Sequence, residues 1–417
     1  NARSIVKPGD IIMAVPKISS KTKEDKTSKE QPLIEVDMQN LKFKDVSWRL
    51  SQIPQVEGAL ITINPKDGAI IALSGGFHYF NSKFNRVTQA KRQPGSTFKP
   101  FIYSAALSRG FSANSSINDA PIVYKISGGK RWRPRNYSKR YYGWTTLRRA
   151  LAYSHNVSSV RLLEKVGVDY TRNYLTNFGF NKKNMPNNLT IALGTGEVTP
   201  LKLVTGYAVF ANGGFRIKPY FIDRIEDSHG KVIYSSNPLK ICRRCPVEIL
   251  TSKLDETKDL LTSYDNCDQI PRYAPKAITS HNAYSMTSML KDVIRIGTAK
   301  KAKQLKRSDI AGKTGTTSNL RDAWFVGYNS DIVTAVWIGF DKPRSLGYKE
   351  TGGRTALPMW IDFMKVAFKG KPIRSLPKRY RSAANKKFKK KKRATSRARK
   401  KKKRTIKRST VIPEQLF

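Results

Sequence analysis

Residues 92–101 read Arg-Gln-Pro-Gly-Ser-Thr-Phe-Lys-Pro-Phe, and they open the part of the chain that decides the fold. Apolar side chains continue from this segment at helical spacing, and Gly110 is placed to end the run, so we predict a helix over 96–109. Pro100 falls in the first turn of that helix, where a missing N–H costs little. The sequence therefore predicts that Ser96 lies at or beside the N-terminus of a strongly apolar helix.

Strand and helix signals on both sides of this helix indicate the fold class. Two apolar runs, 59–63 and 69–73, flank turn residues in a pattern typical of a β-hairpin. Further helices are predicted over 145–152, 157–166, 199–211 and 285–296, with strands over 323–328 and 332–340 and a final helix that ends by Gly370. Strands thus bracket a block of helices, which predicts an α+β fold with an antiparallel sheet packed with helices.

The chain divides into three predicted regions. Residues 1–56 hold a predicted strand at 10–15 and a polar, Lys-rich stretch, which we interpret as the remnant of a small β domain with a linker. The main domain is predicted over 57–370, with a variable insertion at 236–278. Residues 371–417 are predicted to form a disordered basic tail.

Positive charge dominates the chain and is concentrated at its C-terminal end. Lys and Arg number 79 against 30 Asp and Glu, a formal net charge of +49. From Lys369 onward there are 22 basic residues and one acid, Glu414, so this segment alone carries +21. The tail is predicted either to bind an anionic surface or polymer electrostatically or to be a solvated extension. Its only two aromatics between residues 377 and 410 are Tyr380 and Phe388, which disfavours nucleic-acid stacking, and no sequence-specific nucleic-acid binding is expected.

Composition also limits the class of protein. At 39% hydrophobic residues the chain has no run near the roughly 18 apolar residues of a spanning helix, so a membrane bundle is excluded. The chain starts with Asn1 and shows no charged-then-apolar leader. We expect a fragment whose N-terminal portion, including any anchor or targeting signal, is missing.

The three cysteines give a weak signal. Cys242 and Cys245 form a lone C-x-x-C, Cys267 follows later, and no nearby histidine has the spacing of a zinc ligand. We therefore expect no metal and no other cofactor. A disulfide within residues 236–278, in an oxidising compartment, is the favoured interpretation, with free thiols as the alternative.

Ser96 and Lys99 form an S-x-x-K pattern, in which a serine can become a nucleophile. On a helix residues i and i+3 share a face, so the Lys99 amine is expected to reach the Ser96 hydroxyl. A lysine can take the serine proton only when its amine is neutral, and burial or a second cation lowers its pKa. The alternative is a helix-capping serine beside a solvated lysine. The pattern alone is common, because it also occurs at Ser4, Ser20, Ser127, Ser228, Ser288 and Ser375.

Two further patterns strengthen the chemical interpretation. Residues 154–156 read Ser-His-Asn, an S-x-N in a predicted interhelix loop, although Ser154 and Asn156 could merely cap helices. Residues 313–315 read Lys-Thr-Gly, at the start of an edge-like strand where Gly315 would let a ligand backbone approach and threonine hydroxyls can bind a carboxylate. In this order the three patterns are the set of penicillin-binding proteins and class A β-lactamases.

The longer runs around these patterns carry a more specific resemblance. Residues 92–101, the run Gly-Lys-Thr-Gly-Thr-Thr at 312–317 and Asp-Ala-Trp-Phe at 322–325 resemble the transpeptidase domain of a class A, 1A-type penicillin-binding protein. The resemblance covers roughly residues 55–370. It implies a peptidoglycan D,D-transpeptidase on the periplasmic side of the bacterial inner membrane, with stem peptides and β-lactams as its partners. The basic tail is then expected to meet an anionic envelope surface.

The resemblance also implies catalytic roles for four residues. Ser96 would attack the D-Ala-D-Ala carbonyl of a stem peptide, release D-Ala and pass the acyl group to the amine of another stem. Lys99 would be the base. Ser154 and Lys313 would pass the proton towards the leaving amine.

The same resemblance implies a set of substrate-binding residues. Asn156 would bind a substrate amide, and the hydroxyls of Thr314 and Thr316, flanking Gly315, would bind the terminal carboxylate. The backbone N–H groups of Ser96 and Thr316 would form the oxyanion hole.

The resemblance leaves other functions to be distinguished. In such proteins a glycosyltransferase domain and a membrane helix precede this region, and a small OB-like domain lies between the two catalytic domains. Residues 1–56 resemble only the end of that OB-like domain. A β-lactamase needs a water-activating carboxylate, and no E-x-x-L-N-like segment lies between Asn156 and Lys313. A β-lactam sensor or a non-catalytic binding module would keep the fold without turnover, so product formation with an amine acceptor separates these functions.

Overall fold

The computed structural model describes residues 13–16, 48–52, 54–125, 131–242, 272–374 and 376. Most of the predicted tail and the middle of the predicted insertion lie outside these residues. By their contacts the residues form two compact units, Asn1–Glu57 and Gly58–Phe417. In the first unit, strands β1 (Met13–Pro16) and β2 (Trp48–Ser51) pair antiparallel. The OB-like identity of this unit stays a prediction.

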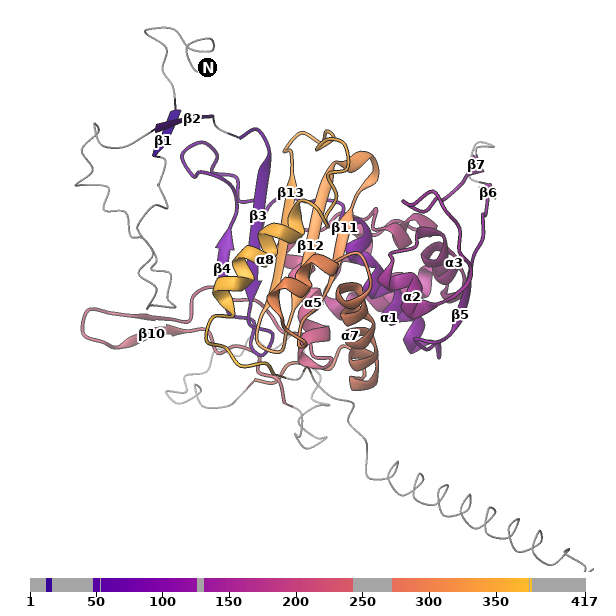
Figure 1. The fold of residues 1–417 in the computed structure, drawn as a ribbon. Helices are drawn as coiled ribbons and strands as arrows, with labels where there is room; N and C mark the ends of the chain where they lie inside the picture. Colours follow the sequence, from indigo (N-terminus) through magenta and orange to yellow (C-terminus); the bar gives the residue numbers. More distant parts are fainter. Residues whose placement is uncertain are drawn as a thin grey trace, which may run out of the picture. The chain divides into compact units, whose positions relative to one another are not determined.

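The second unit contains a five-stranded sheet in the order β11-β12-β13-β3-β4 (Figure 1). Strands β3 (Glu57–Ile63) and β4 (Ile70–Ser74) form the predicted hairpin. Strands β11 (Ala311–Thr316), β12 (Asp322–Tyr328) and β13 (Val333–Gly339) form an antiparallel meander. The strand that carries residues 313–315 therefore lies at an edge of the sheet, as its sequence predicts.

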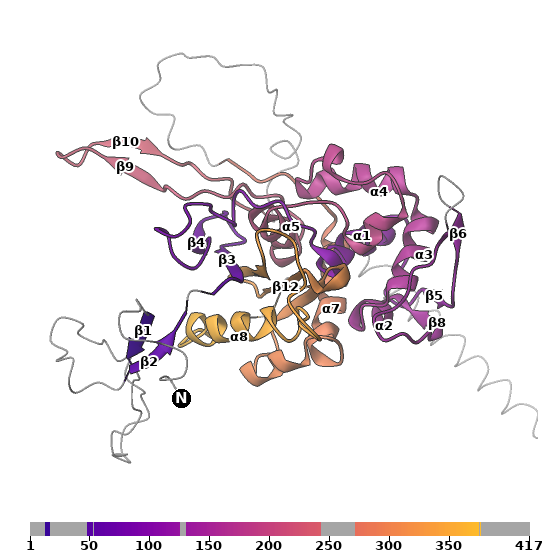
Figure 2. The ribbon, with the colours of Figure 1, turned by 90° about the horizontal axis from the view of Figure 1, so that it is seen from above.

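Helices cover both faces of this sheet, which confirms the α+β class. Phe325 of β12 contacts Trp360 of α8 (Ala356–Ala367), whereas Tyr328 of the same strand contacts Tyr207 of α5 (Pro200–Asn212). Residues three apart on a strand point to opposite faces. Figures 1 and 2 accordingly show α8 on one face of the sheet and α5 on the other.

The remaining helices form the block that the sequence places between the strands. They are α1 (Lys99–Ser108), α2 (Leu147–Ala152), α3 (Asn156–Val166), α4 (Val168–Leu175) and α7 (Ser280–Arg295). Helix α7 begins five residues before the predicted start at 285, because the Thr279 hydroxyl accepts a hydrogen bond from the Asn282 N–H and caps a polar first turn.

Within the described residues of the second unit, three short strand pairs lie outside the main sheet. They are β5 (Ser116–Asp119) with β8 (Gly143–Thr146), β6 (Tyr124–Lys125) with β7 (Arg131–Trp132), and β9 (Arg224–Glu226) with β10 (Val232–Ser235). The pair β5 and β8 leads directly into α2, so it connects the helical block with the loop over residues 133–142.

Two further features of the described residues bear on earlier expectations. Cys242 is disulfide-bonded, in agreement with a disulfide in the predicted insertion, and the other two cysteines lie outside the described residues. Among the helices that the structure describes, none has the length and apolar character needed to cross a membrane.

A buried ion pair ties the segment before Ser96 to the sheet. Arg92 donates from Nε to Oδ1 of Asp322 at 2.8 Å, and the guanidinium lies over the Trp337 ring. Asp322 also accepts hydrogen bonds from Trp337 Nε1 at 2.9 Å and from the Thr317 hydroxyl at 3.0 Å. Both charged side chains are nearly inaccessible to water. Removing one partner would leave the other charge buried without compensation.

We expect Asp322→Asn to lower the free energy of unfolding by about 3–5 kcal/mol, because the Arg92 cation stays buried. The measurement is urea unfolding followed by tryptophan fluorescence. Asp362→Asn is the matched control, since Asp362 is 70% exposed and pairs with Lys365 three residues away. The control should change stability by less than about 0.5 kcal/mol. Equal effects of the two substitutions would contradict the assigned role of Asp322.

Candidate active site

A pocket of about 720 Å³ is lined by five of the eight predicted site residues, which come from distant parts of the chain. Its walls include Ser96, Ser154 and Asn156, together with Thr314 and Thr316 of the edge strand β11. The residues that line it include no Asp or Glu in the described part of the chain. The same described residues contain no group of three or more His, Cys, Asp or Glu that could hold a metal ion. In the described part of the chain the lining of the pocket is therefore rich in hydroxyl groups and contains no acid.

Ser96 lies on a 3₁₀ turn, η2 (Gly95–Phe98), and helix α1 begins only at Lys99. The predicted helix is thus a tight turn followed by an α-helix. Pro100 has no N–H to donate to the Ser96 carbonyl, which instead accepts from the Lys99 N–H in an i to i+3 bond. The neighbours of Ser96 on this turn are buried, whereas Ser96 itself is half-buried and lines the pocket.

Glycines allow the turn to lie directly against its neighbours. A Cβ on Gly194, where φ is +73°, would lie 2.1 Å from the Gly95 carbonyl oxygen. A Cβ on Gly315 would lie 2.6 Å from the Pro94 carbonyl oxygen. The missing side chain of Gly315 therefore lets this turn pack against β11, and the expected approach of a ligand backbone at Gly315 stays a prediction.

The Lys99 side chain is fully buried, and its amine is held by the S-x-N segment. Nζ donates to the Ser154 carbonyl and to Asn156 Oδ1 at 2.7 Å each, and to the His155 carbonyl at 3.2 Å. Within the described chain it makes no hydrogen bond to the Ser96 hydroxyl, so the expected contact is absent from this structure. Burial, followed by the nearby charge of Lys313, holds the pKa of Lys99 well below its usual value.

Lys313 places a second buried amine beside the first. Its Nζ donates to the Ser154 hydroxyl at 2.8 Å and to the Thr314 carbonyl at 3.0 Å. Burial lowers the pKa of Lys313 to about 7. Lys99 also contacts the Ser154 hydroxyl, at 3.3 Å, so this oxygen lies between the two amines. Ser154 adopts φ +60°, a strained backbone region for a non-glycine residue that directs its side chain to this position.

The predicted carboxylate-binding hydroxyls have partners in the structure. The Thr314 hydroxyl is 2.6 Å from the hydroxyl of Thr298, and the Thr316 hydroxyl accepts from the Gly352 N–H at 3.1 Å. Thr298 also lines the pocket, and no motif in the sequence indicates it. It follows helix α7, so only the packing of that helix against β11 brings it to the site.

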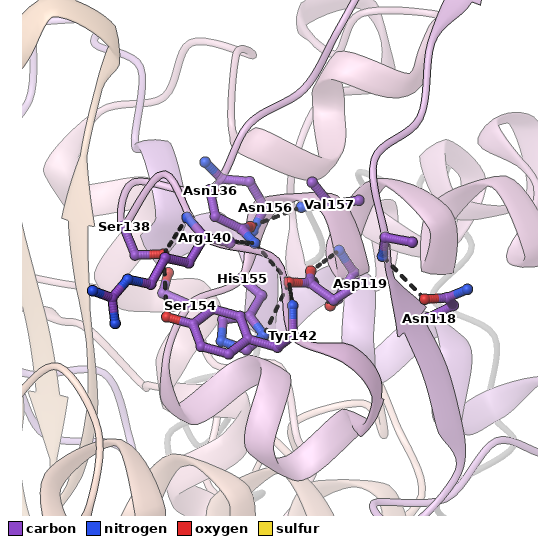
Figure 3. A network of polar contacts seen from close by, with 12 residues as sticks. Asn118, Asp119, Asn136, Ser138, Arg140, Tyr142, Ser154, His155, Asn156 and Val157 are labelled. Carbon is purple, nitrogen blue, oxygen red and sulfur yellow. Dashed lines mark hydrogen bonds and ion pairs between the residues drawn. The ribbon is translucent and has the colours of Figure 1, made fainter.

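His155, the middle residue of S-x-N, is buried and also lines the pocket. Its ring stacks on Tyr142, with centroids 4.4 Å apart, and its Nδ1 lies 3.8 Å from Oδ2 of Asp119 (Figure 3). Burial, only partly opposed by the Asp119 charge, lowers the pKa of His155. Sequence analysis missed Asp119 and its neighbour Asn136, because neither belongs to a recognisable motif.

Comparisons with known proteins agree with this geometry. The family described as penicillin-binding protein transpeptidase domain matches residues 58–359. The chain is 47% identical to penicillin-binding protein 1A of Neisseria lactamica over 327 residues, which cover 78% of this chain and 37% of that protein. It is 45% identical to penicillin-binding protein 1A of Pseudomonas aeruginosa over 355 residues, which cover 80% of this chain and 43% of that protein.

A solved structure supports the same relationship. The crystal structure of penicillin-binding protein 1A from Haemophilus influenzae superposes with a TM-score of 0.72 at 40% identity, over 79% of this chain and 50% of that one. The chain thus spans about half or less of the relatives that it matches. The family match over residues 58–359 and these likenesses show that the chain belongs to the penicillin-binding protein transpeptidase domain family.

Proposed function

We propose that this protein is a serine-type peptidoglycan D,D-transpeptidase that forms an acyl-enzyme at Ser96 and is acylated there by β-lactams. The observation that carries this proposal is the Ser154 hydroxyl, which contacts the buried amines of Lys99 and Lys313 in the pocket that Ser96 lines. Family membership and the names of the relatives, penicillin-binding protein 1A, support the same activity.

In the proposed acylation, neutral Lys99 takes the hydroxyl proton of Ser96 while Oγ attacks the carbonyl carbon of the D-Ala-D-Ala bond. The C–N bond breaks, and the leaving D-Ala amine receives a proton through the Ser154 hydroxyl. The buried position of Lys99 favours the neutral amine that this step needs. The amine of a second stem peptide then attacks the acyl-enzyme, which forms the cross-link and frees Ser96.

The proposed oxyanion hole consists of the N–H groups of Ser96 and Thr316. A Cβ on Gly95 would lie 3.3 Å from the Thr316 nitrogen, so the two segments that carry these donors are in contact. We further propose that the hydroxyls of Thr314 and Thr316 bind the terminal carboxylate of the donor, joined by Thr298. The amide of Asn156 would bind the substrate backbone next to the reacting bond.

A β-lactamase is the main alternative, and the pocket argues against it. Rapid hydrolysis of the acyl-enzyme requires a general base that activates water, and the lining residues in the described part of the chain offer no carboxylate. The acyl-enzyme should therefore persist until an amine attacks. A β-lactam sensor would also keep its acyl group, but it would form no cross-linked product.

The proposed function also implies a location for the enzyme and a binding role for the basic tail. Stem peptides are outside the cytoplasm, so we place the enzyme on the periplasmic side of a bacterial inner membrane. The segment from Lys369 onward carries +21, and such charge density suits an anionic envelope surface. Its affinity would come from released counterions rather than from reading a sequence.

The decisive test of the activity follows one peptide ending in D-Ala-D-Ala in the presence of an amine acceptor. We expect the unaltered protein to release D-Ala and to form the amide product, and Ser96→Ala to form neither and to lose labelling by fluorescent penicillin. Ser228→Ala is the matched control, because Ser228 heads another S-x-x-K pattern and is exposed. Persistent labelling of Ser96→Ala would refute the nucleophile assignment, and labelling without amide product would indicate a sensor.

A further prediction concerns how the rate of acylation depends on pH. Acylation needs neutral Lys99, so its rate should fall in acid as Lys99 gains a proton. Lys313→Met removes a nearby positive charge that lowers the pKa of Lys99, so that pKa should rise and the acid limb of the rate profile should move to higher pH. The maximal rate should also drop by about 10²-fold or more, as Ser154 loses a proton-transfer partner. Stopped-flow acylation between pH 5 and 9 measures the maximal rate and the position of the acid limb. An acid limb that stays in place in Lys313→Met would exclude the proposed effect of the Lys313 charge on the pKa of Lys99.

Deletion of residues 377–417 tests the proposed role of the basic tail. The shortened protein should keep its rate of penicillin acylation but bind anionic vesicles more weakly, since it loses most of the charged tail. Binding of both proteins is measured across a salt series, with neutral vesicles and double-stranded DNA as comparisons. Affinity of the full chain that barely changes with salt, or that depends on DNA sequence, would contradict a purely electrostatic interaction.

A further inference from the structure

Asp119 is a fully buried carboxylate outside the pocket, and it accepts hydrogen bonds from two other segments of the chain. At the end of β5 it accepts hydrogen bonds from the Ser158 hydroxyl at 2.7 Å and the Ser158 N–H at 3.1 Å. It also accepts from Asn136 Nδ2 at 2.6 Å and from the Tyr142 N–H at 3.2 Å. Figure 3 shows Asn136 and Tyr142 beside the carboxylate. The loop over 133–142 and the first turn of α3 are therefore joined through one side chain.

Asn136 extends this connection to the S-x-N segment. Its Nδ2 is directed to Asp119 and to the Arg140 carbonyl, so its Oδ1 must face the opposite way. That oxygen accepts from the N–H of Asn156 at 2.7 Å and of Val157 at 3.2 Å, two otherwise unpaired donors at the start of α3. Asp119 thus determines the orientation of the Asn136 amide, and that amide fixes the start of the helix.

The start of α3 is also where the Lys99 amine is bound. Asn156 offers its N–H to Asn136 and its Oδ1 to Lys99, so one residue links the two hydrogen-bond groups. The backbone carbonyls of Ser154 and His155 complete the Lys99 site. A shift of α3 or of its first turn would therefore move three acceptors of the catalytic amine together.

We propose that Asp119 and Asn136 are positioning residues for acylation, which hold the S-x-N segment so that its oxygens bind the Lys99 amine. This inference rests on the proposed function of Ser96 and Lys99. Asp119 touches neither Ser96 nor the pocket, and it acts through Asn136 and the start of α3. The S-x-N pattern at Ser154 is therefore only one part of the structure that binds the lysine.

A purely structural role for Asp119 is the competing explanation. The negative charge of Asp119 provides a way to distinguish the positioning role from the structural role. The titratable groups around the carboxylate are His155 on the S-x-N turn and Lys99 and Tyr103 on α1. The negative charge of Asp119 raises the pKa of Lys99, against the larger effect of burial. Without that charge the pKa of Lys99 falls, so the acid limb of acylation should move to lower pH. Loss of folded protein alone would lower the amount that reacts and leave the limb in place.

The test measures penicillin acylation of the full chain between pH 5 and 9, with the reactive fraction titrated at long times. Asp119→Asn should lower the plateau rate by about 10–100-fold, because small displacements of reacting groups carry costs of that order, and should shift the acid limb to lower pH. Asn136→Ala should lower the plateau similarly without that shift, because Asp119 keeps its charge. Asp169→Asn, at an 80% exposed position on α4, is the matched control and should change neither.

The outcomes separate this inference from the proposed function. If the unaltered chain shows no labelling that depends on Ser96, the proposed function fails. If it labels normally and folded Asp119→Asn keeps its plateau rate, or keeps its acid limb, the positioning role is overturned. Should Asp119→Asn not fold, Asn136→Ala decides: a lowered plateau with a full reactive fraction supports the role, and an unchanged plateau overturns it.

Discussion

The burial of two lysine amines beside each other is the constraint on which the site depends. A buried ammonium group must be hydrogen-bonded or lose its proton, and here both lysines are removed from water. The acceptors are carbonyl, amide and hydroxyl oxygens, so they satisfy the N–H groups without adding the countercharge that a carboxylate in contact would supply. The pKa of each lysine therefore stays low, and the Ser154 hydroxyl between them is in place for proton transfer.

This arrangement requires that three segments approach closely, and backbone geometry makes the approach possible. The turn that carries Ser96 lies between Gly194 and the edge strand β11, where added side-chain carbons would overlap neighbouring backbone. The buried pair of Arg92 and Asp322 joins the same region to the sheet. Ser96, the proposed nucleophile, thus lies on a short turn that is closely packed on two sides, which suits a reaction that depends on the orientation of the reacting groups.

A second layer of polar contacts adjoins the S-x-N segment that binds the Lys99 amine. Asp119 and Asn136 place the start of α3, and the stacked rings of Tyr142 and His155 cover them. Asn136, Tyr142 and His155 of this layer line the pocket, whereas Asp119 does not, and a network of buried hydrogen bonds holds its members in one arrangement. The positioning role proposed for Asp119 assigns this layer a function in acylation.

The α+β class, the edge position of β11 and part of the pocket lining, including Ser96, Ser154 and Thr314, are predictable from the sequence alone, because helix periodicity, strand alternation and motif order are local signals. The sequence places the start of α7 too late, since a polar first turn hides the apolar period. Three contacts appear only in the tertiary structure: the S-x-N segment binds the Lys99 amine, Gly315 makes room for the turn that carries Ser96, and Asp119 binds Asn136. Those contacts join residues far apart in the chain, and such pairings leave no periodic trace in a single sequence.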